Sequence, residues 1–506
     1  MANSAAERVR CARLKDRIIS ADAAAAMIRD GMNVVVPTFT SIDRPLSIGK
    51  AVLRHAEATG SPKNLTLITS ANGHDIFDNK WVQAGLIKRR LDWITEPVIR
   101  KYANTPGGVH FQDVHLSHAA EQIKHGWYGG IDYVLLSVTG VTEEGHLLPS
   151  FCQGFSQLSL TAAKNVILEI NTHTCEDIHV LHDVYEVGKL PVRDPIPIRR
   201  PGDIIGRDYY ECDLDKIRGI VISDEPLDFP PAPAPVERDG PLAEMAGHFI
   251  RFLKDEVAAG RLPEHLLPLQ IGVGAAADAG VCFLGENFTG LTMYSETLGF
   301  GAMELLEKGV VSCVSTGGIS ATEDMLNNIM RHPERYRGRL VIRPTEITNN
   351  PEVIKRLGLI SMNNAVEADI YGNINSSHVM GSRIISGIGG SCDFSRNAYL
   401  SVFFTLSTAK GGKLSSIVPF CSHIDSTEHD VKIIVTEQGV ADLRNCSPWE
   451  RAQRIIAIAH PDFRPQLQDY YDRAAEKCRD GRGHTPHILS EALSWHVRAE
   501  ETGSML

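Results

Sequence analysis

The 506-residue sequence lacks several short patterns that identify common kinds of protein. Its ten cysteines are scattered and contain no CxxC pair, which speaks against cysteine-pair zinc or redox sites and favours reduced thiols. No GxSxG, HExxH or GxxxxGK[ST] pattern occurs. A serine esterase, a zinc protease and a P-loop nucleotide hydrolase therefore lose support.

The sequence also lacks an excess of basic residues and any long apolar run. The net charge is -11 and the pI about 6.0, so the concentrated positive charge that nucleic-acid binding requires is missing. No window reaches the roughly 18 to 20 apolar residues needed to cross a bilayer. We expect a soluble protein that binds neither nucleic acid nor membrane. Its location is predicted to be cytoplasmic, with an Arg-rich mitochondrial presequence as the alternative.

What the sequence does contain is an alternation of short β-branched runs with longer helix-like stretches. The runs in the first half cover 33–39, 64–70, 131–139, 165–171 and 219–224. This alternation is typical of an α/β protein with a largely parallel sheet. A proline-rich segment then interrupts it, and prolines at that density indicate a linker. A helix with apolar residues at helical spacing follows, and the alternation begins again.

The second half of the chain repeats features of the first. The stretch KNLTLITSANG (63–73) aligns with TGLTMYSETLG (289–299), and such self-similarity predicts a duplicated α/β domain. The alternative is chance, because strand-turn-helix units resemble one another in many proteins. We predict a first domain over 1–224, a linker over 225–240, and a second domain over 241–506 that ends in a helical extension.

In this alignment Ser70 takes the place of Glu296. A structural requirement would be met in both copies, so Glu296 indicates a function that only the second half carries. Active sites of open α/β sheets lie at the carboxyl ends of the strands, where we expect this glutamate. The alternative is a salt-bridged carboxylate on the rim of the sheet.

Other segments of the second half contain residues suited to chemistry. The GVG at 272–274 could present backbone amides to an anion, or it could be a tight structural turn. The three glycines within 386–401 suggest that something approaches the backbone closely. Glu437 ends a further strand before a glycine, while Asn349 alone has the character of an ordinary turn residue.

The stretch CSHIDSTEH also contains potential metal ligands. It places Cys421, His423, Asp425 and His429 at close spacing. No known zinc-ligand spacing is matched, and residues two apart on a strand share a face without converging on one ion. The sequence therefore predicts no metal site.

In combination, these segments resemble the acetyl-CoA hydrolase/transferase family of class I CoA-transferases, which includes succinyl-CoA:acetate and propionyl-CoA:succinate CoA-transferases. The segments that carry the resemblance are GVG at 272–274, MYSE at 293–296, EADIYGNINSSHVMG at 367–381, GIGGSCDFSRNAYLS at 387–401 and TEQGVADLR at 436–444. The resemblance covers nearly the whole chain. It implies two similar open α/β domains of that type, pseudo-duplicated and joined by the linker, in a homodimer.

The resemblance implies that Glu296 is the nucleophile. It would attack an acyl-CoA thioester and then form a glutamyl-CoA thioester, and an unperturbed glutamate, with a pKa of about 4.3, needs no general base for this. The other catalytic positions implied are the amides of Val273 and Gly390, the side chain of Asn349, and Glu437. The implied CoA contacts are Gly272, Val273, Gly274, Ala275, Ala276, Val366, Gly390 and Lys410.

The function so implied is transfer of CoA between an acyl-CoA and a small carboxylic acid of the acetate, propionate or succinate type. Coenzyme A or acyl-CoA is then a substrate, and no cofactor is bound permanently. Hydrolysis of acyl-CoA on the same scaffold is one alternative, and non-catalytic binding of a small ligand is another. The chain departs from the family pattern at 36–47, 275–280 and 297–301. In the first of these segments, Arg44 is a candidate partner for a distal carboxylate of the substrate.

Overall fold

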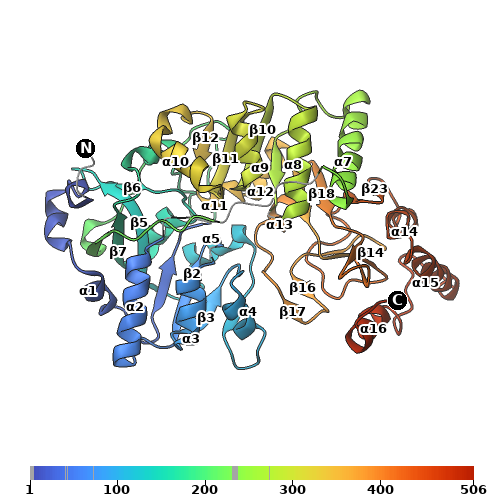
Figure 1. Ribbon diagram of the computed structural model, residues 1–506, viewed down its shortest axis with the longest axis horizontal. Coiled ribbons are helices and arrows are strands. Elements are labelled where there is room, and N and C mark those ends of the chain that lie inside the picture. Colours follow the sequence, from blue (N-terminus) through green and yellow to red (C-terminus); the bar gives the residue numbers. More distant parts are fainter. Residues whose placement is uncertain (1–4, 40–41, 43, 72, 231–237, 273) are drawn as a thin grey trace. The chain divides into compact units, whose positions relative to one another are not determined.

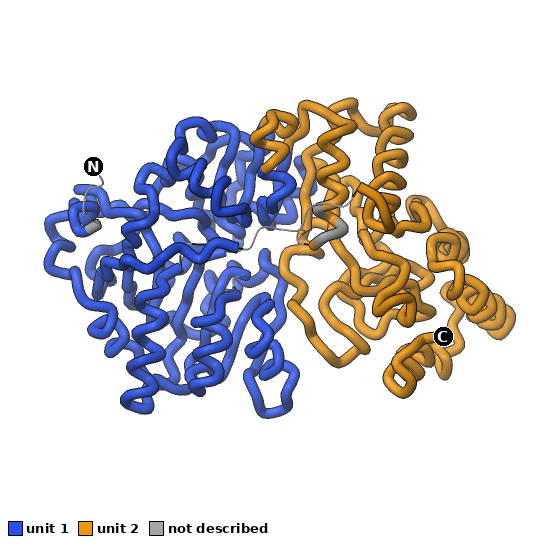
Figure 2. The backbone as a smooth tube through the Cα atoms, in the orientation of Figure 1, with its two compact units in different colours: residues 1–233, 293–303, 313–357 blue, residues 234–292, 304–312, 358–506 orange. Residues whose placement is uncertain are grey.

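The computed structural model describes residues 5–39, 42, 44–71, 73–230, 238–272 and 274–506. The chain forms two compact units, each assembled from separate segments (Figure 2). The first unit comprises residues 1–233, 293–303 and 313–357, and the second comprises 234–292, 304–312 and 358–506. The linear division of the chain around a linker at 225–240 stays a prediction, and residues 231–237 of that linker lie outside the described residues.

The first unit contains a sheet with the parallel order β4-β3-β2-β1-β5-β7-β8 (Figure 1). The strands are β1 (Asn33–Val36), β2 (Leu65–Thr69), β3 (Ile87–Leu91), β4 (His110–Gln112), β5 (Ile131–Val141), β7 (Ala163–Asn171) and β8 (Ile217–Ser223), with β6 (Leu147–Pro149) antiparallel to β5. Five of these strands were expected. The other three, β3, β4 and β6, were not; β3 has a polar sequence because of its exposed Lys88 and Arg89.

Helices cover both faces of this sheet because alternate strand residues point to opposite sides. Val34 and Val36 pack with Val52 in one buried cluster, whereas Val35 packs with Val134 in another. The helices are α1 (Ala21–Ala25), α2 (Leu46–Thr59), α3 (Trp81–Gln83), α4 (Pro97–Ala103), α5 (Leu116–Lys124) and α6 (Ser156–Ala162).

The strand order repeats after the linker. The first unit contains the order β12-β11-β10, and the second unit contains β9-β13-β18-β22-β23. The strands are β9 (Leu269–Ile271), β10 (Leu291–Leu298), β11 (Val311–Ile319), β12 (Leu340–Ile342), β13 (Ile360–Asn364), β18 (Leu400–Phe404), β22 (Ile433–Thr436) and β23 (Gly439–Asp442). The two runs match β4-β3-β2 and β1-β5-β7-β8, with β23 added antiparallel. This repetition confirms the duplicated α/β fold. It shows that β2 and β10 occupy matching places in the two strand orders.

The helices of the second repeat follow the same alternation. They are α7 (Pro241–Ala258), α8 (Ala275–Asn287), α9 (Phe300–Glu307), α10 (Glu323–Arg331), α11 (Thr345–Thr348), α12 (Pro351–Leu357) and α13 (Ser391–Asn397). Short strands lie between β13 and β22, namely β14 (Glu367–Asp369), β15 (Ile374–Asn375), β16 (His378–Val379), β17 (Arg383–Ile384), β19 (Thr408–Ala409), β20 (Leu414–Ser415) and β21 (Ile417–Val418).

Three helices end the chain and pack on a buried cluster of the second unit. They are α14 (Pro448–Ala457), α15 (Arg464–Lys477) and α16 (Ser494–Thr502). Ile455, Leu467 and Trp495 bring their apolar faces into that cluster, which also holds Phe403 of β18. Within the described part of the chain, no helix combines the length and the apolar character that a membrane span requires.

Candidate active site

Glu296 lies within β10, two residues before the strand ends at Leu298. Its side chain is half-buried, whereas the neighbouring Ser295 and Thr297 are buried. We expected this glutamate at the end of the strand. The strand continues because the Ser320 N–H donates a hydrogen bond to the Leu298 carbonyl at 2.9 Å. Glu296 therefore lies inside the strand, with strand residues before and after it.

The side chain of Asn349 contacts the carboxylate of Glu296. Its Nδ2 donates a hydrogen bond to Glu296 Oε2 at 2.6 Å. Asn349 is fully buried, and its Oδ1 accepts a hydrogen bond from the Thr348 hydroxyl at 2.8 Å. The amide can satisfy both contacts only with its NH₂ group toward the glutamate. The structure thus brings these two residues together, while their catalytic roles stay predictions.

The short helix α11, which ends at Thr348 directly before Asn349, is anchored on several sides within the first unit. The Tyr294 hydroxyl donates to the Ile347 carbonyl at 2.6 Å, and the Thr345 N–H donates to the Gly154 carbonyl at 2.8 Å. Ser70, the counterpart of Glu296 in the first repeat, is buried with its Oγ 3.4 Å from Thr345 Oγ1. One copy of the repeated strand thereby helps to position a helix that serves the other copy.

Two buried ion pairs also hold this helix. Lys124 Nζ lies 2.9 Å from Glu346 Oε2, and burial raises the pKa of the Glu346 carboxyl against the opposing effect of Lys124. Arg343, just before the helix, pairs with Asp183, and both side chains are fully buried. Burial lowers the pKa of Arg343 to about 9. Removing one partner of such a pair leaves an uncompensated buried charge, which is strongly destabilising.

Gly317 lets β11 approach the backbone of the glutamate. A Cβ at this position would lie 3.0 Å from the Glu296 carbonyl oxygen and 3.5 Å from Thr348 Oγ1. The neighbouring Thr316 hydroxyl donates to the same carbonyl at 3.2 Å. Sequence reasoning missed this glycine, although the paired glycines in STGGIS after an apolar run were a usable signal.

The glycines of the GVG segment lie in the second unit beside β13. Cβ atoms at Gly272 and Gly274 would meet Asn363 Oδ1 at 2.8 Å and Asn364 Nδ2 at 2.5 Å. A side chain at either position would have to displace an asparagine side chain of β13, and Gly274 also has a φ of 140°. Gly274 precedes α8, whose first turn contains Ala275 and Ala276. Val273 lies outside the described residues.

The glycine-rich loop before α13 contains two left-handed residues, Gly387 and Gly389, with φ of 122° and 54°. Gly390 is buried and caps the helix, and its carbonyl accepts a hydrogen bond from the Phe394 N–H at 3.2 Å. The close approach of another group to this backbone stays a prediction, as does the role of the Gly390 amide as an oxyanion donor.

Glu437 lies in the turn between β22 and β23 in the second unit. Its carboxylate accepts hydrogen bonds from the Ser407 N–H, at 2.8 Å, and from the Ser407 hydroxyl. Lys410 is exposed at the tip of the hairpin β19–β20, with φ of 49°. Val366 is half-buried, and its N–H donates to the Asn375 carbonyl at 2.8 Å. These predicted positions belong to the second unit, whereas Glu296 belongs to the first (Figure 2).

The first unit also contains a cavity of about 350 Å³ that the divergent segment 36–47 helps to line. Its wall includes Arg44, His74, Asp228 and Ser320. The guanidinium of Arg44 lies 3.8 Å from Asp228, so a carboxylate of this chain already faces it. Burial lowers the pKa of His74 to about 4, which makes this imidazole neutral near pH 7.

Comparisons with known proteins decide the family. The model of the acetyl-CoA hydrolase/transferase N-terminal domain matches residues 2–221, and that of the C-terminal domain matches residues 323–471. The chain belongs to the acetyl-CoA hydrolase/transferase family. The resemblance stated from the sequence is thus confirmed, and the members of this family act on CoA thioesters, by transfer or by hydrolysis.

Individual relatives in this family carry both activities in their names. The chain is 41% identical to the succinyl-CoA:acetate CoA-transferase of Clostridium kluyveri, over 99% of this chain and 92% of that one. It is 37% identical to the propanoyl-CoA:succinate CoA transferase of Escherichia coli, over 96% and 98%. It is also 37% identical to the acetyl-CoA hydrolase of Schizosaccharomyces pombe, over 92% of each chain.

The crystal structure of RipA from Yersinia pestis shares the fold. The TM-score is 0.70 at 21% identity, over 92% of this chain and 98% of that one. Fold likeness at this identity carries no activity with it, so the assignment to the family of CoA-thioester enzymes rests on the domain models and the curated relatives.

Proposed function

We propose that this chain is a CoA-transferase that moves CoA between an acyl-CoA and a small carboxylic acid through a covalent thioester on Glu296. The observation that carries the proposal is the 2.6 Å hydrogen bond from Asn349 Nδ2 to the Glu296 carboxylate. It places an amide donor beside a half-buried carboxylate. This carboxylate lies in β10, at the position where the first repeat has Ser70. The acetate, propionate and succinate class of acids follows from the two transferases named above.

The chemistry balances without any further reagent. The Glu296 carboxylate attacks the thioester carbonyl, and the C–S bond breaks to give an acyl-glutamyl anhydride and CoA thiolate. The thiolate attacks the glutamyl carbonyl, which releases the first carboxylate and leaves glutamyl-CoA. A second carboxylate then reverses these two steps and regenerates Glu296. No net proton transfer is required, which fits a carboxylate nucleophile without a general base.

Each attack passes through a tetrahedral oxyanion. Hydrogen-bond donors stabilise this oxyanion. In the proposal Asn349 supplies one donor, and the backbone amides of Val273 and Gly390 supply others. Losing one such donor raises the barrier by about 3 kcal/mol. Glu437 would lie near the carboxylate of the acid substrate, and the segment 272–276 with Val366 and Lys410 would contact CoA.

The covalent intermediate can be tested directly by mass spectrometry. The full chain is incubated with acetyl-CoA without an acceptor acid, quenched and digested. We expect the peptide that contains Glu296 to gain the mass of CoA less one water. The variant Glu296→Ala should show no gain, whereas Glu323→Gln, an exposed glutamate on α10, should behave as wild type. Full turnover with an unmodified Glu296 peptide would rule the mechanism out.

Hydrolysis is the second candidate, because relatives named acetyl-CoA hydrolases match the whole chain at similar identity. Water could intercept the anhydride or the glutamyl thioester on the same scaffold. The two activities differ in the amount of free CoA thiol that they release. A transferase given succinyl-CoA and acetate should make acetyl-CoA with little free CoA, whereas a hydrolase should release free CoA equally with and without acetate. No turnover under either condition would favour a ligand-binding protein.

A further inference from the structure

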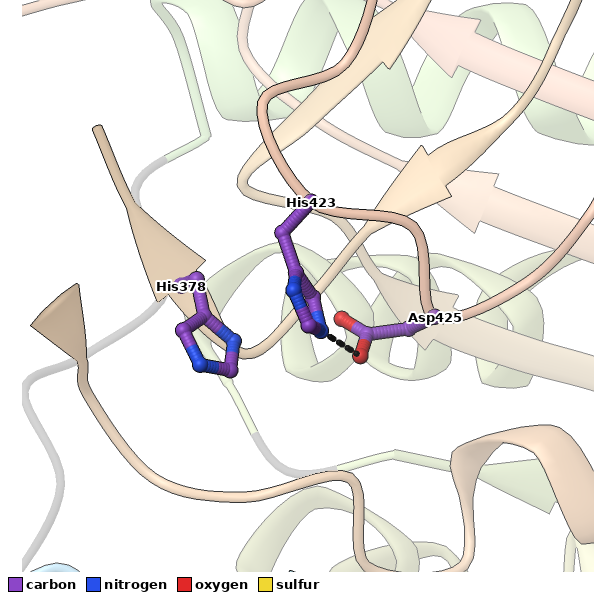
Figure 3. A group of neighbouring side chains, drawn as sticks. All are labelled: His378, His423 and Asp425. Carbon is purple, nitrogen blue, oxygen red and sulfur yellow. Dashed lines mark ion pairs between the residues drawn. The ribbon is translucent and has the colours of Figure 1, made fainter. Parts of the chain in front are cut away.

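Two histidines and an aspartate of the second unit form a cluster, to which the sequence pointed through His423 and Asp425 but not through His378. His378 comes from β16, while His423 and Asp425 come from the loop after β21 (Figure 3). His423 Nε2 lies 3.2 Å from Asp425 Oδ1, and the two imidazole rings are 3.7 Å apart between centroids. One potential ligand atom from each side chain falls within 4.8 Å of the other two.

The carboxylate of Asp425 is fixed before any ligand binds. Its Oδ2 accepts hydrogen bonds from the N–H groups of Ser376 and Ser377, at 2.6 and 2.9 Å. The Ser377 hydroxyl lies 2.8 Å from both oxygens of the carboxylate. The Asp425 side chain is 5% exposed, whereas that of His423 is 36% exposed. The cluster therefore has a rigid, buried side and a side that is open to solvent.

The same hydroxyl determines the tautomer of His378. Ser377 Oγ also lies 2.8 Å from His378 Nδ1. A serine hydroxyl has one proton, and an ionised carboxylate can only accept, so Ser377 donates to Asp425 and accepts from His378. In the empty site His378 Nδ1 then bears the proton, and a metal ion that bound this nitrogen would displace that proton.

We propose that His378, His423 and Asp425 form a binding site for a divalent transition metal such as Zn²⁺. Two imidazoles and one carboxylate are ligands that this class of ion prefers, whereas Mg²⁺ and Ca²⁺ favour oxygen ligands alone. Ligand atoms around a tetrahedral zinc lie about 3.4 Å apart, given metal–ligand distances near 2.1 Å. Ligand atoms up to 4.8 Å apart would have to move closer on binding, and the His423 side chain, 36% exposed, has solvent on one side. Water would complete the coordination.

The site is coupled to the glycine-rich loop through Asp425. The carbonyl of Asp425 accepts a hydrogen bond from the Cys392 thiol at 3.2 Å, and Cys392 follows Gly390 by two residues. The strand β16 also leads directly into that loop through β17. A bound ion would tie these two segments together, so we expect it to stabilise the second unit.

Metal binding to the full chain tests the proposal. Protein freed of metal with a chelator is titrated with Zn²⁺ by calorimetry and with Co²⁺ by visible absorption. We expect one equivalent of each to bind to wild type, with Zn²⁺ raising the melting temperature. His378→Ala and His423→Ala should each weaken binding at least 10- to 100-fold, the loss typical of altered metal sites. His429→Ala, an exposed histidine in the same loop, should bind as wild type does.

Two outcomes would overturn the site. One is the absence of stoichiometric Zn²⁺ or Co²⁺ binding to wild type. The other is unchanged affinity in folded His378→Ala and His423→Ala variants, which would assign the ion to other ligands, such as the cysteines. Far-ultraviolet circular dichroism shows whether each variant folds. Because each histidine is tested separately, one variant that fails to fold leaves the other to decide.

Discussion

The strands β2 and β10 occupy equivalent positions in the repeated strand order, yet they end differently. β2 ends at Thr69, and Ala71 adopts a left-handed φ of 48°. The Ala71 N–H donates to the buried Asp92 carboxylate at 2.7 Å, which stabilises this turn. β10 continues to Leu298, so its glutamate lies on a regular backbone. The two copies share one strand order. They differ at the matched position, because the first copy turns after Thr69 whereas the second continues as a strand to Leu298.

The side chains at the matched position differ as much as the backbones. Ser70 is fully buried, and its hydroxyl faces Thr345 of α11. Glu296 is half-buried and accepts a hydrogen bond from Asn349, at the end of that same helix. Both copies therefore contact this segment, Ser70 at Thr345 in α11 and Glu296 at Asn349 directly after it. This asymmetry predicts that substitutions in the two copies will have very different effects.

The largest effect is expected for Glu296→Gln. The amide oxygen of glutamine can still accept the hydrogen bond from Asn349, so the fold should survive while the nucleophile is lost. We expect kcat/KM to fall on the order of 10⁴-fold or more, as for other nucleophile deletions, with a melting temperature close to that of wild type. Steady-state kinetics and thermal unfolding measure the two quantities. Retention of a substantial share of the activity would remove Glu296 from the chemistry.

Asn349→Ala should have the next largest effect. It removes the side chain that we propose as a hydrogen-bond donor to the oxyanion, so kcat should fall about 10²- to 10³-fold while KM changes little. The adjacent Asn350→Ala is a matched control, because that side chain caps α12 by accepting from the Glu352 N–H at 3.0 Å. A fall confined to KM in Asn349→Ala would make Asn349 a substrate-binding residue instead.

Much of this asymmetry was accessible from the sequence. The β-branched runs that alternate with helix-like stretches predicted the parallel strands, and the alignment of 63–73 with 289–299 predicted that β2 and β10 occupy matching places in the two repeats. Single residues were harder to predict, because contacts such as that of Tyr294 with Ile347 join segments far apart in the chain. His378 was missed for this reason, because only the folded chain brings it to His423 and Asp425.

Asp92 allows the turn after β2 to be tested through pH. Burial raises the pKa of this carboxyl from 3.8 to about 7. The folded state thus binds the proton more tightly than the unfolded state does, and the resulting stability is present below about pH 4 and lost as the pH rises through 7. Between pH 5 and 8 the free energy of unfolding should fall about 2–3 kcal/mol further in wild type than in Asp92→Asn.

Urea unfolding at both pH values measures this difference. Asparagine tolerates the left-handed backbone of residue 92, where φ is 77°, so the comparison isolates the charge. Asp194→Asn, at an exposed position, is the matched control and should keep the pH dependence of wild type. Equal pH dependence in wild type and Asp92→Asn would mean that the carboxylate stays ionised throughout.

The smallest effect is expected for Ser70→Ala, although Ser70 matches Glu296 in the repeat. Its hydroxyl makes a long contact of 3.4 Å with Thr345, so its loss should lower the free energy of unfolding by about 1 kcal/mol. Because α11 keeps its other anchors, from Tyr294 and Gly154, kcat should stay close to the wild-type value. A fall as large as that of Asn349→Ala would mean that the first copy shares in catalysis, and that duplication divided one site between two strands.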